Sequence, residues 1–525
     1  MKADTIILFL YFILICIGAL FFRMKILVIS VEDKWFATIL ALLLGLVIYV
    51  ICKLNCISCR INKQFFNFSI IVSISCCFLA IYGILQAISA ISSNSYFGIA
   101  GGFDNPAGYA ASISAGFPMI LYLLNSCQSK YFIGINIFAA LLMIIAVALS
   151  GSRAGMLSMA VMIIFWLILQ IKVTMRLLFI CFASTILLLF VLYICKKDSA
   201  DGRLLIWQCS WEMIKEKPVT GHGMGGFRTN YMNYQAHYFR QNSDSDYVML
   251  ADNINRPFNE FIMLVVNFGL VGFVLFIFLS YFLIKSYKRN PCDKSKIALC
   301  SLLGMAIFSC FSYPLSYPFV WVMILFATYV IISLANYSIS PVLFRMKKLM
   351  CLFVLCLSLA GITYISVEFI NHIAWGKTVR VSLIKQTDKT FAQYEKLFLK
   401  LKNNYLFLYN YAAELNYGGS YKKSQQIAQE CSKYLSDYEL QLLMGDNCVK
   451  MKEYERAEIY FQQAAYMCPV RFVPLYELMK IYQLKEERQK TKEIAERISC
   501  KPVKIPSERI ERIKKMAHEY LDAVC

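Results

Sequence analysis

The chain has 525 residues, of which 59% are hydrophobic and only 16% are charged. Soluble globular proteins carry about a quarter charged residues, so this composition excludes a wholly soluble protein. The formal net charge is +20, but the basic residues lie in short loops between apolar runs. That pattern indicates membrane topology and argues against nucleic acid as a partner.

Apolar runs long enough to cross a membrane fill the first 370 residues. A transmembrane helix needs about 20 mostly apolar residues, and about eleven segments qualify by that rule. The first is expected to be a span, because no signal-peptide cleavage site follows it. The fourth is rich in Gly, Ala and Ser, which suit close helix packing. The candidates lie near residues 5–22, 36–52, 68–91, 104–124, 131–150, 154–171, 176–195, 259–284, 297–312, 317–336 and 349–370.

Basic residues alternate between the loops and thereby predict the orientation. Cytoplasmic loops carry an excess of Lys and Arg, so the N-terminus and the basic loops are expected in the cytoplasm. The polar loop 196–258 and the tail after residue 370 then lie on the outer face, which is periplasmic in a bacterium. The basic loops hold Lys53, Arg60, Lys63, Lys130, Lys172, Arg176, Lys285, Lys288, Arg289, Lys294, Lys296, Arg345, Lys347 and Lys348.

Many of the 20 cysteines lie inside apolar runs, where Cys behaves as a small apolar residue. Cys56 and Cys59 form a CxxC motif near Cys52. No second pair or suitably spaced histidine follows, so we interpret the motif as free thiols in a reduced cytoplasmic loop. Neither a metal site nor a cofactor is predicted.

Residues 376–525 are charged and Tyr-rich, and we expect them to form a second domain. Tyr421, Tyr454 and Glu487 recur at a period near 33–34 residues, the length of a tetratricopeptide repeat. An array of about three degenerate repeats is predicted, with an unrelated helical bundle as the alternative. The expected fold is therefore all-α: a polytopic transmembrane bundle over residues 1–370, and a tetratricopeptide-like solenoid.

The outer loop carries a helix-like segment followed by a Gly-rich turn. Arg203 begins a run with helical apolar spacing that Pro218 ends. The turn at 221–226 is expected to leave backbone amides free for an anion. No strand precedes it, so it fails the context test for a dinucleotide-binding motif.

Four motifs, in this order, resemble the O-antigen ligase and polymerase superfamily, which also contains protein O-oligosaccharyltransferases. The resemblance covers about residues 70–335. The motifs are Phe103–Pro106, then Ser150–Arg153, then Arg203 and Trp207 with Pro218, Gly221, Gly223, Phe227 and Tyr231, and finally Asn259–Phe261 followed by Asn267–Gly272.

This resemblance implies a GT-C-like glycosyltransferase of the bacterial inner membrane. Such an enzyme takes a glycan from an undecaprenyl diphosphate carrier at the periplasmic face and passes it to a hydroxyl of a glycan, lipid A core or protein. It implies an inverting reaction with no metal or nucleotide cofactor. Ligase, polymerase and oligosaccharyltransferase activities all stay open. The implied partners are the lipid-linked donor, the acceptor and membrane lipids, and a repeat array offers a surface for a protein partner.

Arginines pair phosphate oxygens bidentately and stay charged at any working pH. The leaving diphosphate develops negative charge, which such groups stabilise. Arg153, Arg203 and Arg228 are therefore the candidates for binding the donor diphosphate, and Arg256 and Arg203 are the candidates for catalysis.

An acceptor hydroxyl needs a base within hydrogen-bond distance. The family usually has His before the Asn of the fourth motif, and this chain has Phe258 there. Glu260 is the candidate base, with His222 and His237 of the loop as alternatives. Substrate-binding or structural roles are expected for Asn105, His222 and Asn259.

Each candidate also has a structural interpretation. Arg153 suits an interfacial anchor, and Arg203 a surface salt bridge. Asn105 suits a helix cap, His222 a structural turn residue, and Glu260 a helix first turn. Two other functions compete with transfer: a lipid-linked glycan flippase, disfavoured because the charges cluster at one face, and a non-catalytic scaffold.

Overall fold

The computed structural model describes residues 3–24, 30–54, 61–92, 98–126, 128–170, 194, 197–337, 347–384 and 388–524. All regular structure in these ranges is helical, which confirms the predicted fold class. The chain forms two compact units. The first comprises Met1–Ile194, Phe258–Glu260 and Leu275–Gly376, and the second comprises Cys195–Pro257, Phe261–Val274 and Lys377–Cys525.

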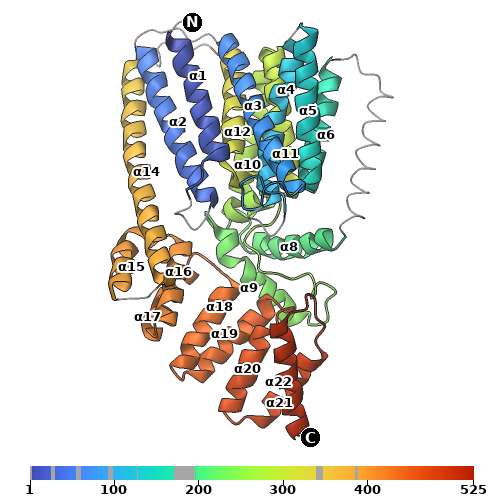
Figure 1. Cartoon of the computed structure of the whole chain (residues 1–525), viewed down its shortest axis with the longest axis vertical. Helices are drawn as coiled ribbons and strands as arrows, with labels where there is room; N and C mark the ends of the chain where they lie inside the picture. Colours follow the sequence, from blue (N-terminus) through green and yellow to red (C-terminus); the bar gives the residue numbers. More distant parts are fainter. Residues whose placement is uncertain are drawn as a thin grey trace. The chain divides into compact units, whose positions relative to one another are not determined.

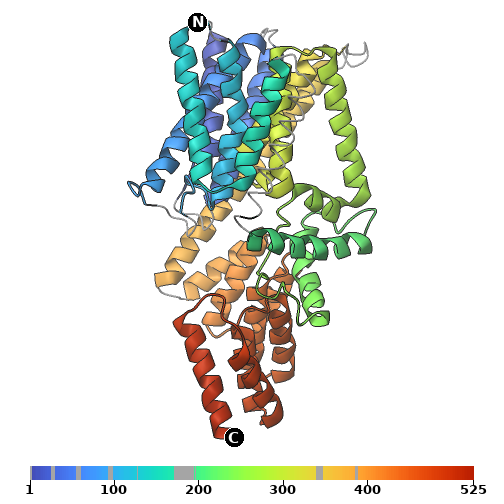
Figure 2. The same cartoon turned by 90° about the vertical axis from the view of Figure 1, so that its right-hand side faces the viewer.

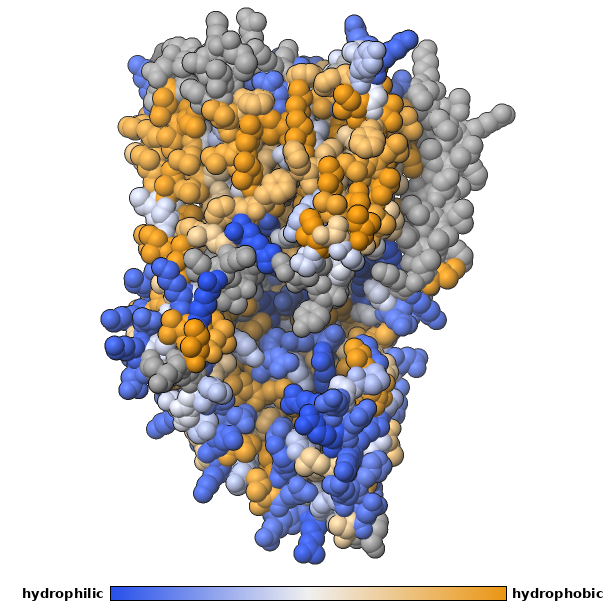
Figure 3. Space-filling model, viewed as in Figure 1, coloured by the Kyte–Doolittle hydropathy of each residue, from blue (hydrophilic) through white to orange (hydrophobic). Residues whose placement is uncertain are grey.

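The first unit is a bundle of long apolar helices (Figures 1 and 2). On the face drawn in Figure 3, apolar side chains cover the surface over these helices. Parts of α10 and α14 belong to the second unit. The helices are α1 (Ala3–Cys16), the π-helix η1 (Ile17–Phe21), α2 (Ser30–Leu54), α3 (Ile61–Ala87), α4 (Pro106–Ser126), α5 (Lys130–Leu149), α6 (Arg153–Gln170), α10 (Glu260–Arg289), α11 (Asp293–Phe311), the 3₁₀ turn η2 (Pro314–Ser316), α12 (Pro318–Leu334) and α14 (Lys347–Ile384).

Eight described helices are long and apolar enough to cross a membrane, namely α2 to α6, α10, α11 and α14. Two shorter apolar helices, Phe9–Phe21 and Pro318–Leu334, occupy the first and tenth expected spans. The seventh, near residues 176–195, lies almost wholly outside the described residues, as do Cys56 and Cys59. The protein is a multi-pass membrane protein, but the count of about eleven spans is not confirmed.

Helix α4 lies at the centre of the first unit, with 89% of its apolar window buried. It packs against α3, α5, α6, α11 and α12. A Cβ at Gly116 would lie 2.3 Å from the Cys76 sulfur on α3. Small residues therefore allow these helices to approach closely, as the sequence predicted for this span.

The second unit contains the outer-loop helices α8 (Lys197–Glu216) and α9 (Gly226–Gln241) and an array of helical hairpins. The second helices of the hairpins begin at Tyr421, Tyr454 and Arg488, which confirms the predicted repeat period. The array consists of α15 (Asp388–Leu401), the hairpins α16–α17 (Tyr405–Tyr417 and Tyr421–Ser432), α18–α19 (Tyr438–Lys450 and Tyr454–Met467) and α20–α21 (Val473–Leu484 and Arg488–Cys500), and α22 (Glu508–Val524).

The outer loop is part of the same compact unit as the array, whereas it was expected to belong to the membrane domain. Helix α9 packs on α19. Gln235 of α9 is fully buried, and its amide nitrogen donates to the carbonyl oxygens of Met467 at 2.6 Å and Asp252 at 3.0 Å. The Tyr231 hydroxyl donates to the Gln235 side-chain oxygen at 2.7 Å. Buried groups bonded in this way hold the loop on the array.

Replacing Gln235 should destabilise the second unit. Gln235→Leu keeps the side-chain size but leaves two carbonyls and a hydroxyl buried without their partner, which should lower the free energy of unfolding by about 2–4 kcal/mol. Thermal unfolding of the full-length protein in detergent measures the effect. Gln241→Leu, at an exposed position of the same helix, is the control, and equal unfolding midpoints for the two variants would contradict the assigned contacts.

Candidate functional site

A polar cluster lies at the start of α4, where Asn105 caps the helix. Its side-chain oxygen accepts from the amides of Ala107 at 2.9 Å and Gly108 at 3.1 Å, as its structural interpretation predicted. Its side-chain nitrogen donates to the Tyr313 hydroxyl at 3.0 Å. The Tyr317 hydroxyl donates to Asn105 at 3.1 Å and lies 3.3 Å from an Asp104 carboxylate oxygen. Asn105 is thus both a cap and the centre of a hydrogen-bonded group.

The fourth sequence motif meets this cluster in the same unit. The Glu260 Oε1 atom accepts from the backbone amide of Leu315 at 3.1 Å. The Asn259 side-chain nitrogen donates to the Cys310 carbonyl at 3.0 Å. The Phe258 ring lies edge-on to Tyr313, with centroids 5.4 Å apart. Glu260 and Asn259 therefore fix the turn between α11 and α12, which carries Tyr313.

Phe258 has a left-handed backbone conformation, with φ of 53°. That conformation costs roughly 1–2 kcal/mol for a residue with a side chain. Strain of this kind persists where surrounding contacts determine the backbone, and it gathers at functional sites. Phe258 therefore has a special backbone geometry, and its ring offers no proton acceptor.

Arg153 is the first residue of α6 and is half-buried. The start of α6 lies beside the first turns of α4, because a Cβ at Gly155 would come within 3.1 Å of the Ala110 side chain. A cation at a helix N-terminus is repelled by the positive end of the helix macrodipole. This placement is unfavourable for helix stability, but it adds to the positive potential that an anion would meet at this end of the unit.

Arg203 and Arg256 both lie in the second unit and are half-buried. Arg203 and Trp207 are one turn apart on the same face of α8. The Trp207 indole nitrogen donates to the carbonyl of Pro257 at 3.0 Å. This bond ties the segment that carries Arg256 to the face of α8 on which Arg203 lies.

Cys209 lies on the same helix α8. Burial raises the pKa of its thiol to about 12, so it stays protonated at neutral pH and is a poor nucleophile. Among the described residues, no group of three His, Cys, Asp or Glu side chains could hold a metal ion.

The Gly-rich turn differs from its expected role. The amides of His222 and Gly223 donate to the carbonyls of Val266 and Asn267, each at 2.9 Å. The Phe227 amide donates to the Asn267 side-chain oxygen at 3.1 Å, and the Gly221 amide donates to Lys217. These amides are used inside the protein, so the prediction of an open anion-binding turn is wrong for them. The turn instead packs against the break in α10, where Gly269 has φ of 60°.

His222 is held by the same packing. Its Nε2 atom lies 2.9 Å from the Met213 carbonyl, and its ring lies edge-on to Tyr234, with centroids 6.0 Å apart. These contacts agree with the structural interpretation of His222.

Arg228 points at the array. Its guanidinium lies over the Tyr405 ring, 4.0 Å from the centroid, and its Nε atom donates to the Tyr434 carbonyl at 3.2 Å. The carbonyl of Arg228 accepts from the Ser436 amide at 3.0 Å. The structure thus gives Arg228 a role in holding loop and array together, rather than the diphosphate-binding role expected from sequence.

Sequence reasoning missed Tyr313 and Tyr317. The turn that carries them repeats Ser-Tyr-Pro, at Ser312–Pro314 and Ser316–Pro318. That doubled motif was the available signal. Only the structure shows that both hydroxyls reach Asn105.

Residues 138–277 match the family model described as O-antigen ligase. No curated protein sequence matches the chain. Ten chains of solved structures match. One is yeast Tom70, which is 10% identical and is matched over 92% of this chain and 95% of that chain with a TM-score of 0.26. At that TM-score, the likeness to Tom70 carries no argument about fold or function.

Two glycines of the 221–226 turn give a matched pair for testing its packing. Both have positive φ, but a Cβ at Gly221 would lie 2.5 Å from the Asn267 backbone, whereas nothing lies within 4 Å of a Cβ at Gly223. Gly223→Ala should cost only the conformational strain of roughly 1–2 kcal/mol. Gly221→Ala should lower the unfolding temperature clearly further, since backbone atoms must move. Equal unfolding temperatures would show that the turn does not pack on the α10 break as described.

Proposed function

Because residues 138–277 match the family model described as O-antigen ligase, we propose that the protein transfers a glycan from an undecaprenyl-diphosphate-linked donor to an acceptor hydroxyl. The family match supports a glycan-transfer role in surface polysaccharide synthesis, with a lipid-linked substrate in a membrane context. The proposed site of the reaction is the periplasmic face of a bacterial inner membrane.

The proposed reaction is an inverting displacement. The acceptor oxygen attacks the anomeric carbon, the bond to the diphosphate breaks, and the proton of the acceptor hydroxyl passes to a base. Glu260 is the proposed base. The Leu315 amide donates to the Glu260 Oε1 atom at 3.1 Å, which fixes the orientation of the carboxylate.

Arg203 and Arg256 are proposed to stabilise the charge that develops on the leaving diphosphate. The hydrogen bond from Trp207 to Pro257 supports a joint role for them, because it fixes the Arg256 segment on the Arg203 face. Arg153 is the proposed further contact of the donor diphosphate. Asn105 and Asn259 are proposed to support the reaction by holding the turn that carries Tyr313.

One substitution set tests these roles. Glu260→Gln keeps an oxygen that can accept the Leu315 amide but removes the charge. Arg203→Ala and Arg256→Ala remove the charges proposed for the leaving group. Each variant should lower the transfer rate by about 100-fold or more, as removal of a single charge-stabilising group does in other enzymes. Transfer to surface glycan and accumulation of lipid-linked donor are measured in the native bacterium, with protein levels matched.

Arg240→Ala is the matched control, since Arg240 is an exposed arginine of the same loop and should leave transfer unchanged. A non-catalytic scaffold is the competing function. Phe258, packed on Tyr313 in the position where the family has His, is the observation that favours it. Normal product from Glu260→Gln and Arg256→Ala would overturn the catalytic assignment and support the scaffold.

We also propose a cytoplasmic N-terminus and a periplasmic C-terminal array that presents an acceptor or binds a protein partner. The alternation of basic loops supports this orientation. Alkaline phosphatase, which folds only where disulfides form, should be active when fused after residue 524 and inactive when fused after Asn290. The reverse pattern would invert the topology.

A further inference from the structure

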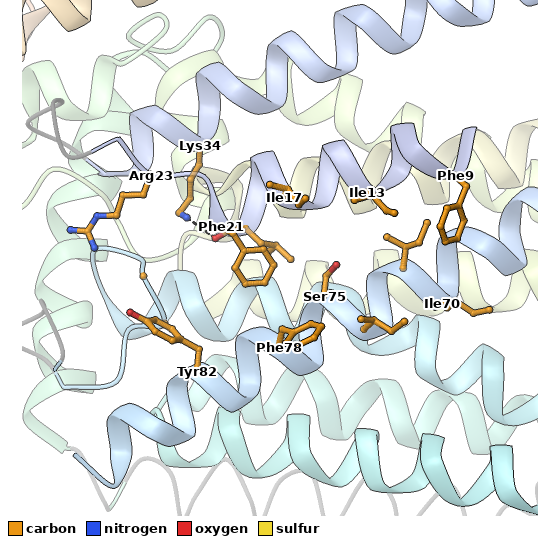
Figure 4. A pocket seen from close by; sticks show the side chains of 15 residues that line it. Phe9, Ile13, Ile17, Phe21, Arg23, Lys34, Ile70, Ser75, Phe78 and Tyr82 are labelled. Carbon is orange, nitrogen blue, oxygen red and sulfur yellow. Dashed lines mark hydrogen bonds between the residues drawn. The ribbon is translucent and has the colours of Figure 1, made fainter. Parts of the chain in front are cut away.

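A groove runs along the first unit between η1 and α3, with a volume of about 690 Å³. We call it the η1–α3 groove. Figure 4 shows its two walls and, at one end, two cationic side chains. The walls are formed by Phe9, Ile13, Ile17 and Phe21 on one side and Ile70, Ser75, Phe78 and Tyr82 on the other, and the cations are Arg23 and Lys34.

The groove is open along its side. Phe78 is 63% exposed, and Ile17 and Phe21 are 49% and 41% exposed. Both walls belong to apolar helices of a membrane bundle, so this side meets hydrocarbon rather than water. From Phe9 to Phe21 the wall is about 18 Å long at the helical rise of ~1.5 Å per residue. That length is close to the thickness of one leaflet of the hydrocarbon core, which is about 15 Å. An apolar lipid chain that crosses one leaflet would therefore fit along the wall.

A π-helix shapes the wall near the cationic end. The Phe22 amide donates to the Ile17 carbonyl at 2.9 Å, five residues back instead of four. Such a turn shifts the side chains that follow it, and π-turns occur often at functional sites. Here the turn also exposes the Leu20 carbonyl to a side chain from α2.

That side chain is Lys34, which is only 1% exposed. Its Nζ atom donates to the carbonyls of Leu20 at 2.6 Å and Phe22 at 3.3 Å. These two bonds cap the end of η1. An ammonium group has three N–H donors, so the third donor of Lys34 is not used by these carbonyls. A buried charge needs a partner of opposite sign.

The two carboxylates near this end, Glu32 and Asp33, have partners other than Arg23 and Lys34. Arg23 is exposed beside Lys34. The nearby Asp33 carboxylate accepts the Met24 amide at 2.7 Å. No ion pair joins Arg23 or Lys34 to a carboxylate in the part of the chain that the structure describes. The neighbouring Glu32 carboxylate lies 3.2 Å from the His372 Nδ1 atom. Two cations that are paired with neither carboxylate suit the phosphate groups of a lipid.

The cationic end adjoins the polar cluster around Asn105. Lys34 lies over the Phe103 ring, 4.8 Å from its centroid, and Phe103 lies edge-on to Tyr317, with centroids 5.6 Å apart. Tyr317 in turn donates to Asn105. A lipid whose chain fills the groove would therefore have its phosphate beside this cluster.

We infer that the η1–α3 groove holds the apolar chain of a polyprenyl diphosphate, with Arg23 and Lys34 at its phosphate end. The inference rests on the proposed function, because the donor of that reaction is carried on a polyprenyl diphosphate. It assigns recognition of the lipid carrier to a part of the chain outside residues 138–277.

The test measures binding of radiolabelled polyprenyl diphosphate to the full-length protein in detergent. Ser75→Trp fills the groove from the α3 wall and should weaken binding about tenfold, by blocking the chain. Arg23→Gln removes an exposed charge without altering the walls, and should weaken binding about threefold to tenfold. The matched controls are Ile81→Trp, at an exposed position of α3 that does not line the groove, and Lys130→Gln, an exposed lysine of α5. Both should bind as the unaltered protein does.

Competition identifies the occupant. Unlabelled polyprenyl diphosphate should displace the label, whereas polyprenol without phosphate and phosphatidylglycerol should compete at least tenfold more weakly. Equal competition by phosphatidylglycerol would make the groove a general phospholipid site and overturn the inference. Unchanged binding in Arg23→Gln and in folded Ser75→Trp would also overturn it.

Glycan transfer by the unaltered protein separates the two proposals. If the protein transfers glycan but binding is insensitive to the groove variants, the inference fails and the proposed function stands. If it neither transfers glycan nor binds polyprenyl diphosphate, both fail.

Discussion

The missing side chain at Gly108 is the constraint on which the polar cluster depends. A Cβ there would lie 2.3 Å from the Tyr317 ring, so only glycine lets this ring lie against the first turn of α4. From that position the Tyr317 hydroxyl reaches Asn105, and its ring meets Phe103. One residue without a side chain thus permits a hydrogen-bonded cap, a polar cluster and the contact that leads to the η1–α3 groove.

The second unit depends on a different kind of contact, between polar groups of the outer loop and backbone groups of the array. Gln235 and Arg228 bind carbonyls of α19 and of the segment after α17, and Asn253 donates to Asp437 at 2.8 Å. Asp437 is also the N-cap of α18. Hydrogen bonds of this kind are directional, so they fix the register of the loop on the array as well as its attachment.

The sequence predicted those parts of the fold that depend on residues close together in the chain. Apolar runs predicted ten of the described helices, small residues predicted the close packing of α4, and the repeat period predicted the hairpins. Asn105 before Pro106 predicted the helix cap, because capping uses groups two or three residues away. Tyr421 and Tyr454, which the period singled out, lie at equivalent positions in successive hairpins.

Long-range bonds are where local reasoning failed. From the sequence, the amides at the Gly-rich turn were expected to be free for an anion. In the structure the Phe227 amide donates to the side-chain oxygen of Asn267, 40 residues further along the chain. Arg228 was expected to bind phosphate, but its Nε atom donates to the carbonyl of Tyr434, which lies 206 residues away in the chain. The residues next to Phe227 and Arg228 in the sequence do not predict these partners. The same holds for Tyr313 and Asn105, which are 208 residues apart.

The bond between Gln235 and Met467 spans 232 residues of chain, and this separation has a consequence during synthesis. At a translation rate of about 5–20 residues per second, the ribosome makes α19 roughly 10–50 s after α9. Throughout that interval the outer loop lacks the surface that buries Gln235, and several membrane helices are inserted meanwhile. The loop is then open to proteases and chaperones. Its maturation is therefore complete only when the last part of the chain arrives, so a truncated protein would lose the loop structure together with the array.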